Sequence, residues 1–427
     1  MISTTTRTRV LLSAAAVLAL ASCSTPADGP SAAPPPAAAT TELATAAPRL
    51  ALTYDGGVQV LDATTLEVVG DVALGGFLRI NPAGDGRHAL LSTPAGFQVL
   101  DVGSWAEPHG DHAHYYATAP SLLDLTYPAA VPGHVVAHDG RTALFDDGTG
   151  HVVVLDAADV AAPDADVREH STASAHHGVA VELSDGTLVV TEGTAEARTG
   201  IRVLDARGEA LTASDECPGV HGETVAAHET VVLGCEDGVL LYADGTITKV
   251  DSPDAYGRIG NLRSTEGSEL VLGDYDPDPD GGPLTHVALV DVHDGGMALV
   301  DIGAEYTFRS LAVDDEHAFV LADDGRIHVI DPARAQVART IDVLDTWDVP
   351  ADWQQPRPAL VVHDGTGYVT DPARQRVLAV DLDSGEIWNE ASLSVTPNEI
   401  VLTSGDVASS DGGTHDDHDH DHDHGDD

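Results

Sequence analysis

The sequence predicts an all-β fold, and three observations lead to this prediction. Glycine and proline are frequent, at 42 and 24 residues, and lysine is almost absent, a composition that favours turns and short strands over long helices. Apolar residues make up 42% of the 427 residues, which is enough for a sizeable core. A short alternating strand ending in aspartate recurs at steps of 39 to 55 residues, close to the ~40–50 residues of one propeller blade. We therefore expect a single β-propeller.

The net charge excludes one class of partner. The chain carries 20 Lys+Arg against 70 Asp+Glu, a formal charge of −50, and Lys249 is its one lysine. A nucleic-acid-binding protein needs basic surface to replace the counterions of the phosphates. We therefore expect no nucleic-acid partner.

The first 48 residues have the pattern of an export signal followed by a linker. Arg7 and Arg9 precede an apolar run over 10–21 that is too short to span a bilayer. Leu-Ala-Ser-Cys at 20–23 resembles the lipobox of bacterial lipoproteins; the alternative is an export signal that merely contains a cysteine. We expect residues 1–22 to be a lipoprotein signal peptide, Cys23 to carry the lipid, and the Pro/Ala-rich residues 23–48 to be a disordered tether. The protein would then be extracytoplasmic, lipid-anchored to the membrane and monomeric.

The repeated strand sets the architecture of residues 49–403. Its copies lie at 58–62, 97–101, 152–156, 201–205, 239–244, 287–291, 327–331 and 377–381. Another apolar strand precedes each copy, entered through turns such as the Asp-Gly pairs at 139–140, 185–186 and 364–365. One such sheet cannot bury both faces alone, so the units must stack around an axis. Eight copies predict eight blades, or seven if one copy completes another blade at the ring closure.

Two cysteines lie within the predicted propeller. Cys217 and Cys235 are 18 residues apart in a chain expected to be exported, where thiols oxidise. A disulfide is the expected state, and ligation of a metal by the thiolates is the alternative, although the spacing lacks the Cys-x-x-Cys pattern of zinc and redox sites.

Histidines stand just before the innermost strand of three successive units, where a propeller brings residues together at one mouth of its channel. They are His134, His176, His177 and His221. Neutral imidazoles at the ends of rigid strands are suitable zinc ligands, and three or four of them could complete a tetrahedral site. The alternative is that each histidine caps a strand and bonds to a backbone carbonyl.

A second group of candidate ligands lies in the longest step of the repeat, in the loop over 107–116. His112 and His114 are two residues apart and project to the same side if the chain is extended. Asp111 or Asp124 could add an oxygen ligand or orient an imidazole. The sequence predicts metal ligation here, with a solvated loop as the alternative.

The C-terminal residues 404–427 are predicted to be a disordered metal-binding tail. Residues 411–427 hold eight aspartates, no apolar residue and five histidines, namely His415, His418, His420, His422 and His424. Alternating imidazole and carboxylate suit a divalent cation, bound weakly and with fast exchange. Zinc is the expected cation, although such segments also bind nickel, copper and cobalt; the alternative is a solubilising acidic tail.

Several motifs together resemble the AztD-type zinc metallochaperones, a family of exported β-propellers associated with a zinc ABC transporter. They are GDHAHYY at 110–116, SAHHGVAV at 174–181, ECPGVHGE at 216–223 with LGCEDG at 233–238, and the His/Asp run. The resemblance implies zinc binding on the propeller and transfer of zinc to the transporter's solute-binding protein. It also favours the Cys217–Cys235 disulfide. His134 and the tail histidines rest on the argument from the residues alone.

Two other classes of function remain open. Propellers also host metal-dependent hydrolases of the lactonase kind at the same channel mouth. The chain has no Gly-x-Ser-x-Gly elbow and no nucleotide-binding loop, so we expect no enzyme activity. An interaction scaffold with a metal-buffering tail is the other alternative.

Overall fold

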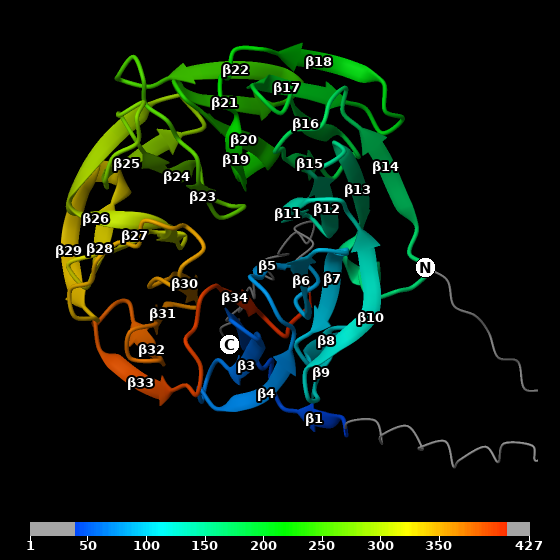
Figure 1. Cartoon of the computed structure of the whole chain (residues 1–427), viewed down its shortest axis with the longest axis vertical. Helices are drawn as coiled ribbons and strands as arrows, with labels where there is room; N and C mark the ends of the chain where they lie inside the picture. The colour runs from blue at the N-terminus through cyan, green and yellow to red at the C-terminus, as the bar shows by residue number, and fades with distance from the viewer. Residues whose placement is uncertain (1–38, 408–427) are drawn as a thin grey trace, which may run out of the picture. The chain divides into compact units, whose positions relative to one another are not determined.

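The computed structural model describes residues 39–407, and strands dominate this part of the chain. Within these residues the strands form eight four-stranded antiparallel blades that follow one another around a central channel (Figure 1). This confirms the predicted all-β propeller and, of the two predicted blade numbers, eight. Strands β2 to β34 of the blades run from Arg49 to Thr403. Among the described residues, no helix is long and apolar enough to cross a bilayer.

The strands of each blade are ordered from the channel outward. Blade 1 holds β34 (Ile400–Thr403), β2 (Arg49–Tyr54), β3 (Gly57–Asp62) and β4 (Val68–Ala73). Blade 2 holds β5 (Arg79–Pro82), β6 (His88–Thr93), β7 (Gly96–Asp101) and β10 (Ser121–Pro128). Blade 3 holds β11 (Pro132–His138), β12 (Arg141–Asp146), β13 (His151–Asp156) and β14 (Val167–Ser171). Blade 4 holds β15 (Ala180–Glu182), β16 (Leu188–Gly193), β17 (Arg198–Leu204) and β18 (Ala210–Ser214).

The remaining blades follow the same order. Blade 5 holds β19 (His221–Ala226), β20 (Thr230–Cys235), β21 (Gly238–Ala243) and β22 (Thr246–Asp251). Blade 6 holds β23 (Leu262–Arg263), β24 (Leu270–Tyr275), β25 (Leu284–Asp291) and the first part of β26 (Met297–Val313). Blade 7 holds the rest of β26, β27 (Ala318–Ala322), β28 (Arg326–Asp331) and β29 (Gln336–Asp342). Blade 8 holds β30 (Leu360–His363), β31 (Thr366–Asp371), β32 (Arg376–Asp381) and β33 (Ile387–Ser392). Three 3-10 turns lie at Ala157–Asp159, Ala227–Glu229 and Pro332–Arg334.

The repeated strand of the sequence is the third strand of every blade, from β3 to β32. Its aspartate starts the turn to the outer strand, as where the Asp62 carboxylate accepts the backbone N–H groups of Thr64 and Thr65. The ring is closed by a strand outside this repeat, since β34 adds to β2 as the inner strand of blade 1. Eight repeats therefore make eight blades.

The core lies between neighbouring blades. Val189 and Val203 of blade 4, for example, pack in one cluster with Leu233 and Leu240 of blade 5, and all four side chains are buried. Because both faces of a blade are covered in this way, its inner strands are held in fixed positions around the channel.

Glu399, just before β34, ties the ring closure to the channel wall. Its carboxylate accepts hydrogen bonds from Arg309 Nη2 at 2.9 Å and from the backbone N–H of Ile80 at 3.1 Å, and it pairs with Arg79 Nε at 2.8 Å. The side chains of Glu399 and Arg309 are only 8% and 7% exposed. This contact joins blades 1, 2 and 7.

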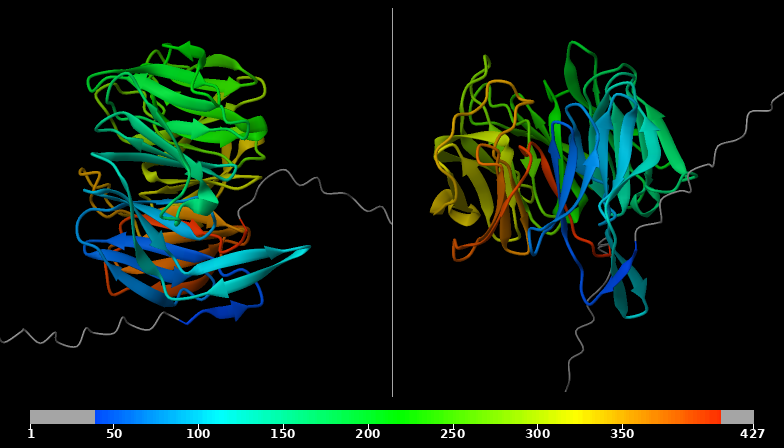
Figure 2. Two further views of the ribbon diagram at one scale, coloured as in Figure 1. Left: turned by 90° about the vertical axis from the view of Figure 1, so that its right-hand side faces the viewer. Right: turned by 60° about the horizontal axis from the view of Figure 1, so that its bottom comes forward.

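A small sheet is inserted between β7 and β10. The hairpin of β8 (Ser104–His109) and β9 (His112–Ala117) extends away from the blades (Figure 2), and β1 (Thr41–Leu43) pairs with β9. Residues 41–43 belong to the segment that the sequence assigns to the tether. They form a strand because the free edge of β9 offers backbone partners, which a composition-based prediction cannot see.

Candidate metal centres

Three histidines meet at one mouth of the channel. His134 is on β11, His177 precedes β15 and His221 begins β19, so they lie at the same end of the inner strands of three successive blades. Their ligating nitrogens lie within 4.8 Å of one another. The ring centroids are 4.9–5.3 Å apart.

Each of the three imidazoles is held from outside through its Nδ1 atom. The contacts are His134 to Glu223 Oε1 at 3.2 Å, His177 to Asp147 Oδ2 at 2.5 Å, and His221 to the carbonyl oxygen of Gly260 at 2.6 Å. Such partners fix the ring orientation of metal-ligating histidines and leave the other nitrogen for the metal. The Nε2 atoms of His177 and His221 are 3.0 Å apart. The arrangement therefore offers three Nε2 atoms to one ion.

Gly222 allows the close approach that positions His221. Its φ is +73°, and a Cβ atom there would lie 2.4 Å from the carbonyl oxygen of Gly260, the acceptor of the His221 bond. A side chain at this position would thus be strained in itself and would displace the carbonyl. This is the physical role of Gly222, the second of the two glycines in the motif at 216–223.

The protonation of two of the imidazoles is set by their surroundings. Burial, together with the neighbouring His134 and His177, holds the pKa of His221 well below its usual 6.5, so this ring is neutral and able to ligate at neutral pH. Burial also acts to lower the pKa of His134, but the charge and hydrogen bond of Glu223 outweigh it and raise this pKa above 6.5. Of the two rings, His134 is thus the one whose surroundings favour the proton over the metal.

His176 lies outside this cluster, although the sequence-based prediction groups it with His177. It is 2% exposed, its Nδ1 atom lies 2.9 Å from the carbonyl oxygen of Ser174, and its Nε2 atom lies 3.0 Å from Thr191 Oγ1. Its ring packs against Phe145. Both nitrogens are engaged, so the structure gives His176 a role in the blade core and not at the mouth.

The residues that orient the cluster were not selected from the sequence. Glu223 lies in the motif at 216–223, two residues after His221, and yet bonds to His134, 89 residues away. Asp147 follows β12 and reaches His177 from the neighbouring blade. No local spacing could have indicated these contacts, because they cross between blades.

A second histidine cluster lies on the β8–β9 hairpin. His109, His112 and His114 have ligating nitrogens within 4.8 Å of one another. His112 and His114 share one face of β9, as predicted for an extended segment, and His109 is opposite His112 in the register. His109 was not selected from the sequence; its signal is its place three residues before His112, across the hairpin turn that contains Gly110, where φ is +66°.

The two aspartates predicted near this cluster differ in position. Asp111 Oδ1 lies 3.2 Å from His112 Nδ1, whereas Asp124 is an exposed residue on β10 outside the cluster. Glu42 of β1, which the sequence did not indicate, holds His114 Nδ1 at 3.1 Å. Cys23 and the five tail histidines lie outside the described residues.

A disulfide joins Cys217 to Cys235, which confirms the pairing expected from the sequence. Both cysteines are fully buried, and the bridge fixes the segment before β19 to the end of β20. The 18-residue separation encloses His221 and Glu223. The disulfide thus restrains the segment that supplies one imidazole and the carboxylate partner of another.

Removing the disulfide should destabilise this segment. We expect the double variant Cys217→Ala/Cys235→Ala to lose about 3 kcal/mol of unfolding free energy, because a loop of this length is no longer closed in the unfolded chain. Urea unfolding followed by circular dichroism measures the loss. An unchanged midpoint would contradict this role.

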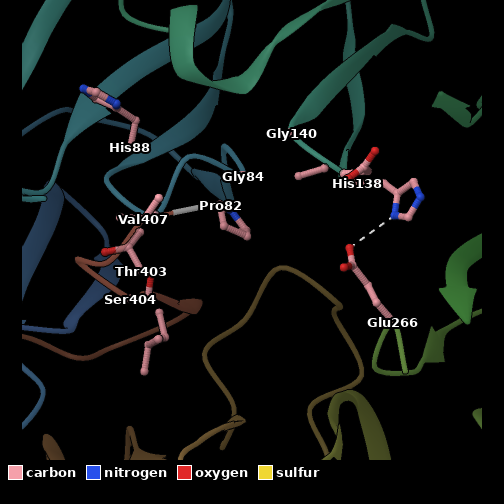
Figure 3. A pocket seen from close by; sticks show the side chains of 13 residues that line it. Pro82, Gly84, His88, His138, Gly140, Glu266, Thr403, Ser404 and Val407 are labelled. Carbon is pink, nitrogen blue, oxygen red and sulfur yellow. Dashed lines mark hydrogen bonds and ion pairs between the residues drawn. The ribbon is translucent and has the colours of Figure 1, made fainter. Parts of the chain in front are cut away.

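The opposite mouth of the channel has a different chemistry. His138 ends β11, four residues after His134, and lines a pocket of about 290 Å³ with Glu266 and Val407 (Figure 3). Its Nδ1 atom lies 3.2 Å from Glu266, and its Nε2 atom lies 3.1 Å from Glu229. Burial acts to lower the pKa of His138, but the two glutamates outweigh it and raise this pKa above 6.5. This imidazole therefore links blades through a carboxylate on each nitrogen, and these contacts favour its protonated form.

The stability that His138 provides should depend on pH. Because its folded pKa is raised, its contribution is fully present below the unfolded value of 6.5 and is lost as the pH rises through the folded pKa. We expect the difference in unfolding free energy between the wild type and His138→Gln to shrink as the pH rises above 6.5. Urea unfolding of both proteins, from below pH 6.5 upward, measures this difference. A free-energy difference that grows as the pH rises would refute the role assigned to His138.

The fold and the clusters define an eight-bladed propeller with three histidines at the mouth of its channel whose nitrogens are close enough to hold one metal ion. The sequence is similar to the zinc chaperone AztD of Citrobacter koseri, with 29% identity over 321 residues that cover 73% of this chain and 74% of the relative. No protein-family model matches the chain.

Solved structures give the same relationship. A crystal structure of Citrobacter koseri AztD superposes with a TM-score of 0.74 and 26% identity, covering 84% of this chain and 98% of that one. Its apo form gives a TM-score of 0.72 and 25% identity, with the same coverage. Dihydro-heme d1 dehydrogenase NirN shares the fold alone, with a TM-score of 0.53, 10% identity, and coverage of 84% of this chain and 75% of that one. The matches to AztD confirm the resemblance to AztD-type proteins that the sequence motifs indicated.

Proposed function

We propose that this protein is an extracytoplasmic zinc metallochaperone, which takes up Zn²⁺ as cargo and hands it to the solute-binding protein of a zinc ABC transporter. The observation that carries the proposal is the convergence of three Nε2 atoms whose Nδ1 atoms are already held by protein acceptors. The similarity to a relative named a zinc chaperone, and not an enzyme, supports it.

The donor set suits a cargo that must leave again. Three imidazoles provide three of the four ligands of tetrahedral zinc, and the fourth position remains for an incoming group. The His177 side chain is 43% exposed, so a ligand from a partner can approach the ion at the channel mouth. An associative exchange of this kind transfers the ion without releasing it into solution.

Direct transfer is the test of this function. Zinc-loaded protein is mixed with the metal-free solute-binding protein encoded beside the same transporter, or with a small chelator of equal affinity, and zinc movement is followed by stopped flow. We expect transfer to the solute-binding protein to be faster than loss to the chelator and to accelerate with its concentration. If zinc reached the solute-binding protein and the chelator at the same rate, set only by its dissociation from this protein, the chaperone assignment would be overturned.

We further propose that the hairpin cluster and the tail form auxiliary capture sites. His109, His112 and His114 are exposed or half-buried, and His415, His418, His420, His422 and His424 lie in the acidic run of the sequence. Two variants separate these sites from the channel mouth: one lacks 408–427, and the other has alanines at the three hairpin positions. The zinc stoichiometry of each is compared with that of the wild type. Unchanged stoichiometry in both would refute the proposal.

The cellular placement belongs to the same proposal. The segment over 1–22 and Cys23 support export followed by lipid anchoring, and the protein would act as a monomer at the membrane surface. Cys23→Ala should leave the membrane fraction or remain unprocessed. A processed variant that still fractionates with membranes would oppose anchoring at this cysteine.

A hydrolase is the second candidate, because three histidines with a free fourth position are also the donor set of hydrolytic zinc sites. Turnover of a lactone or ester that is lost with His221→Ala would favour it over the chaperone.

A further inference from the structure

The channel holds a concentration of basic side chains that the zinc site does not use. A cavity of about 530 Å³ is lined by the inner strands, and Arg79, Arg263 and Arg309 contribute to it from β5, β23 and β26. Glu223 and Glu399 are the carboxylates on this lining among the described residues. The whole chain has only 20 basic residues and a net charge of −50, so three arginines at one cavity stand out from the composition.

The two carboxylates do not neutralise the three guanidinium groups. Glu399 is shared between Arg79 and Arg309. Glu223 is bonded to His134 of the zinc site. Within residues 39–407, Arg263 forms no ion pair, and its Nη1 donates to the neighbouring carbonyl oxygen of Leu262 at 2.7 Å. The cavity lining thus carries three guanidinium groups against two carboxylates, and the buried Asp274 also acts on Arg263 from outside the lining.

The three groups differ in exposure, since Arg309 is buried whereas Arg79 and Arg263 are exposed to the channel. Desolvation inside the channel lowers the pKa of Arg263 against the opposing charges of Glu223 and Asp274, and burial lowers the pKa of Arg309 to about 10. The charge of Arg79 also acts to lower both values. A guanidinium without a carboxylate partner can donate two parallel hydrogen bonds to a planar oxyanion.

We propose that this cavity binds a small oxyanion, held by the fork of Arg263 and by the donors of Arg79 that Glu399 does not use. The site adjoins the three-histidine cluster, because Glu223 lines the cavity and also bonds to His134. Zinc at the mouth adds positive charge beside the cavity, so an anion in the cavity and zinc at the mouth favour each other. By linkage, the anion then raises the affinity for zinc by the same factor as zinc raises that for the anion. Anion binding itself does not rest on the proposed function, whereas this coupling does.

The first experiment uses metal-free, full-length protein and needs no zinc. Sodium sulfate and sodium succinate are titrated by calorimetry against sodium chloride at equal ionic strength, so that inorganic and carboxylate ligands are distinguished. We expect saturable binding of at least one of them, weakened at least about tenfold in Arg263→Gln. Arg326→Gln, which removes an exposed arginine on β28, is the matched control and should bind as the wild type does.

The outcomes decide the proposal. Binding no stronger than that of chloride, or equal binding by Arg263→Gln, would overturn it. Arg263→Lys keeps the charge and loses the fork, so weakened binding by this variant supports the assignment even if the glutamine variant does not fold.

Zinc affinity is then measured by chelator competition in sulfate and in chloride. An increase in sulfate that Arg263→Gln abolishes supports the coupling, and an unchanged affinity refutes it. Absence of any tight zinc site would contradict the proposed function and leave the anion result standing.

Discussion

Replacing His221 with alanine is expected to weaken zinc binding by more than about 100-fold. Loss of an outer partner of a metal-bound histidine already costs about 10–100-fold, and this change removes a ligand itself. His221 combines a low pKa, a fixed Nδ1 bond to Gly260 and an Nε2 atom 3.0 Å from that of His177. Chelator competition on a protein lacking 408–427 measures the affinity without interference from the tail.

Two comparisons make this result specific. His293→Ala changes an exposed histidine in the turn after β25 and should leave the zinc affinity unchanged. Glu223→Gln and Asp147→Asn should each give an intermediate loss of about 10–100-fold, because they act on the orientation of a ligand. If His221→Ala bound zinc as tightly as His293→Ala, the channel-mouth site would be refuted.

Glu399→Gln is expected to have the largest effect on stability, a loss of about 3–5 kcal/mol of unfolding free energy. The change leaves the Arg309 guanidinium, whose side chain is 7% exposed, without its charged partner. It also weakens the acceptor that joins Ile80 of blade 2 to the closing strand of the ring. Urea unfolding of the metal-free protein measures the loss.

The matched control is an ion pair on the surface. Asp342→Asn removes the partner of Arg326, where the Asp342 side chain is 85% exposed, and should cost no more than about 1 kcal/mol. Equal costs for Glu399→Gln and Asp342→Asn would mean that the buried pair contributes nothing beyond a surface pair.

Much of the fold could be predicted because its signals are local. The alternation of apolar residues and the aspartate that starts each turn, as at Asp62, are properties of a few consecutive residues. Strand β1 could not be predicted, since Thr41, Glu42 and Leu43 become a strand only by pairing with β9. The ring-closing strand β34 likewise lacks the repeated aspartate and depends on β2.

The sequence by itself determined the repeat, the disulfide partners and the placement of histidines before the inner strands. Only the tertiary structure decided which histidines meet. His176 and His177 are adjacent, and yet one packs against Phe145 in the core while the other reaches the channel mouth. Both faces of a blade are buried, so the composition does not show whether a side chain in this segment points into the blade core or toward the channel mouth. The outer partners Asp147, Glu223 and Gly260 belong to other parts of the ring than the histidines they hold. Blade stacking creates these contacts, because they join residues that are distant in sequence and depend on how neighbouring sheets pack.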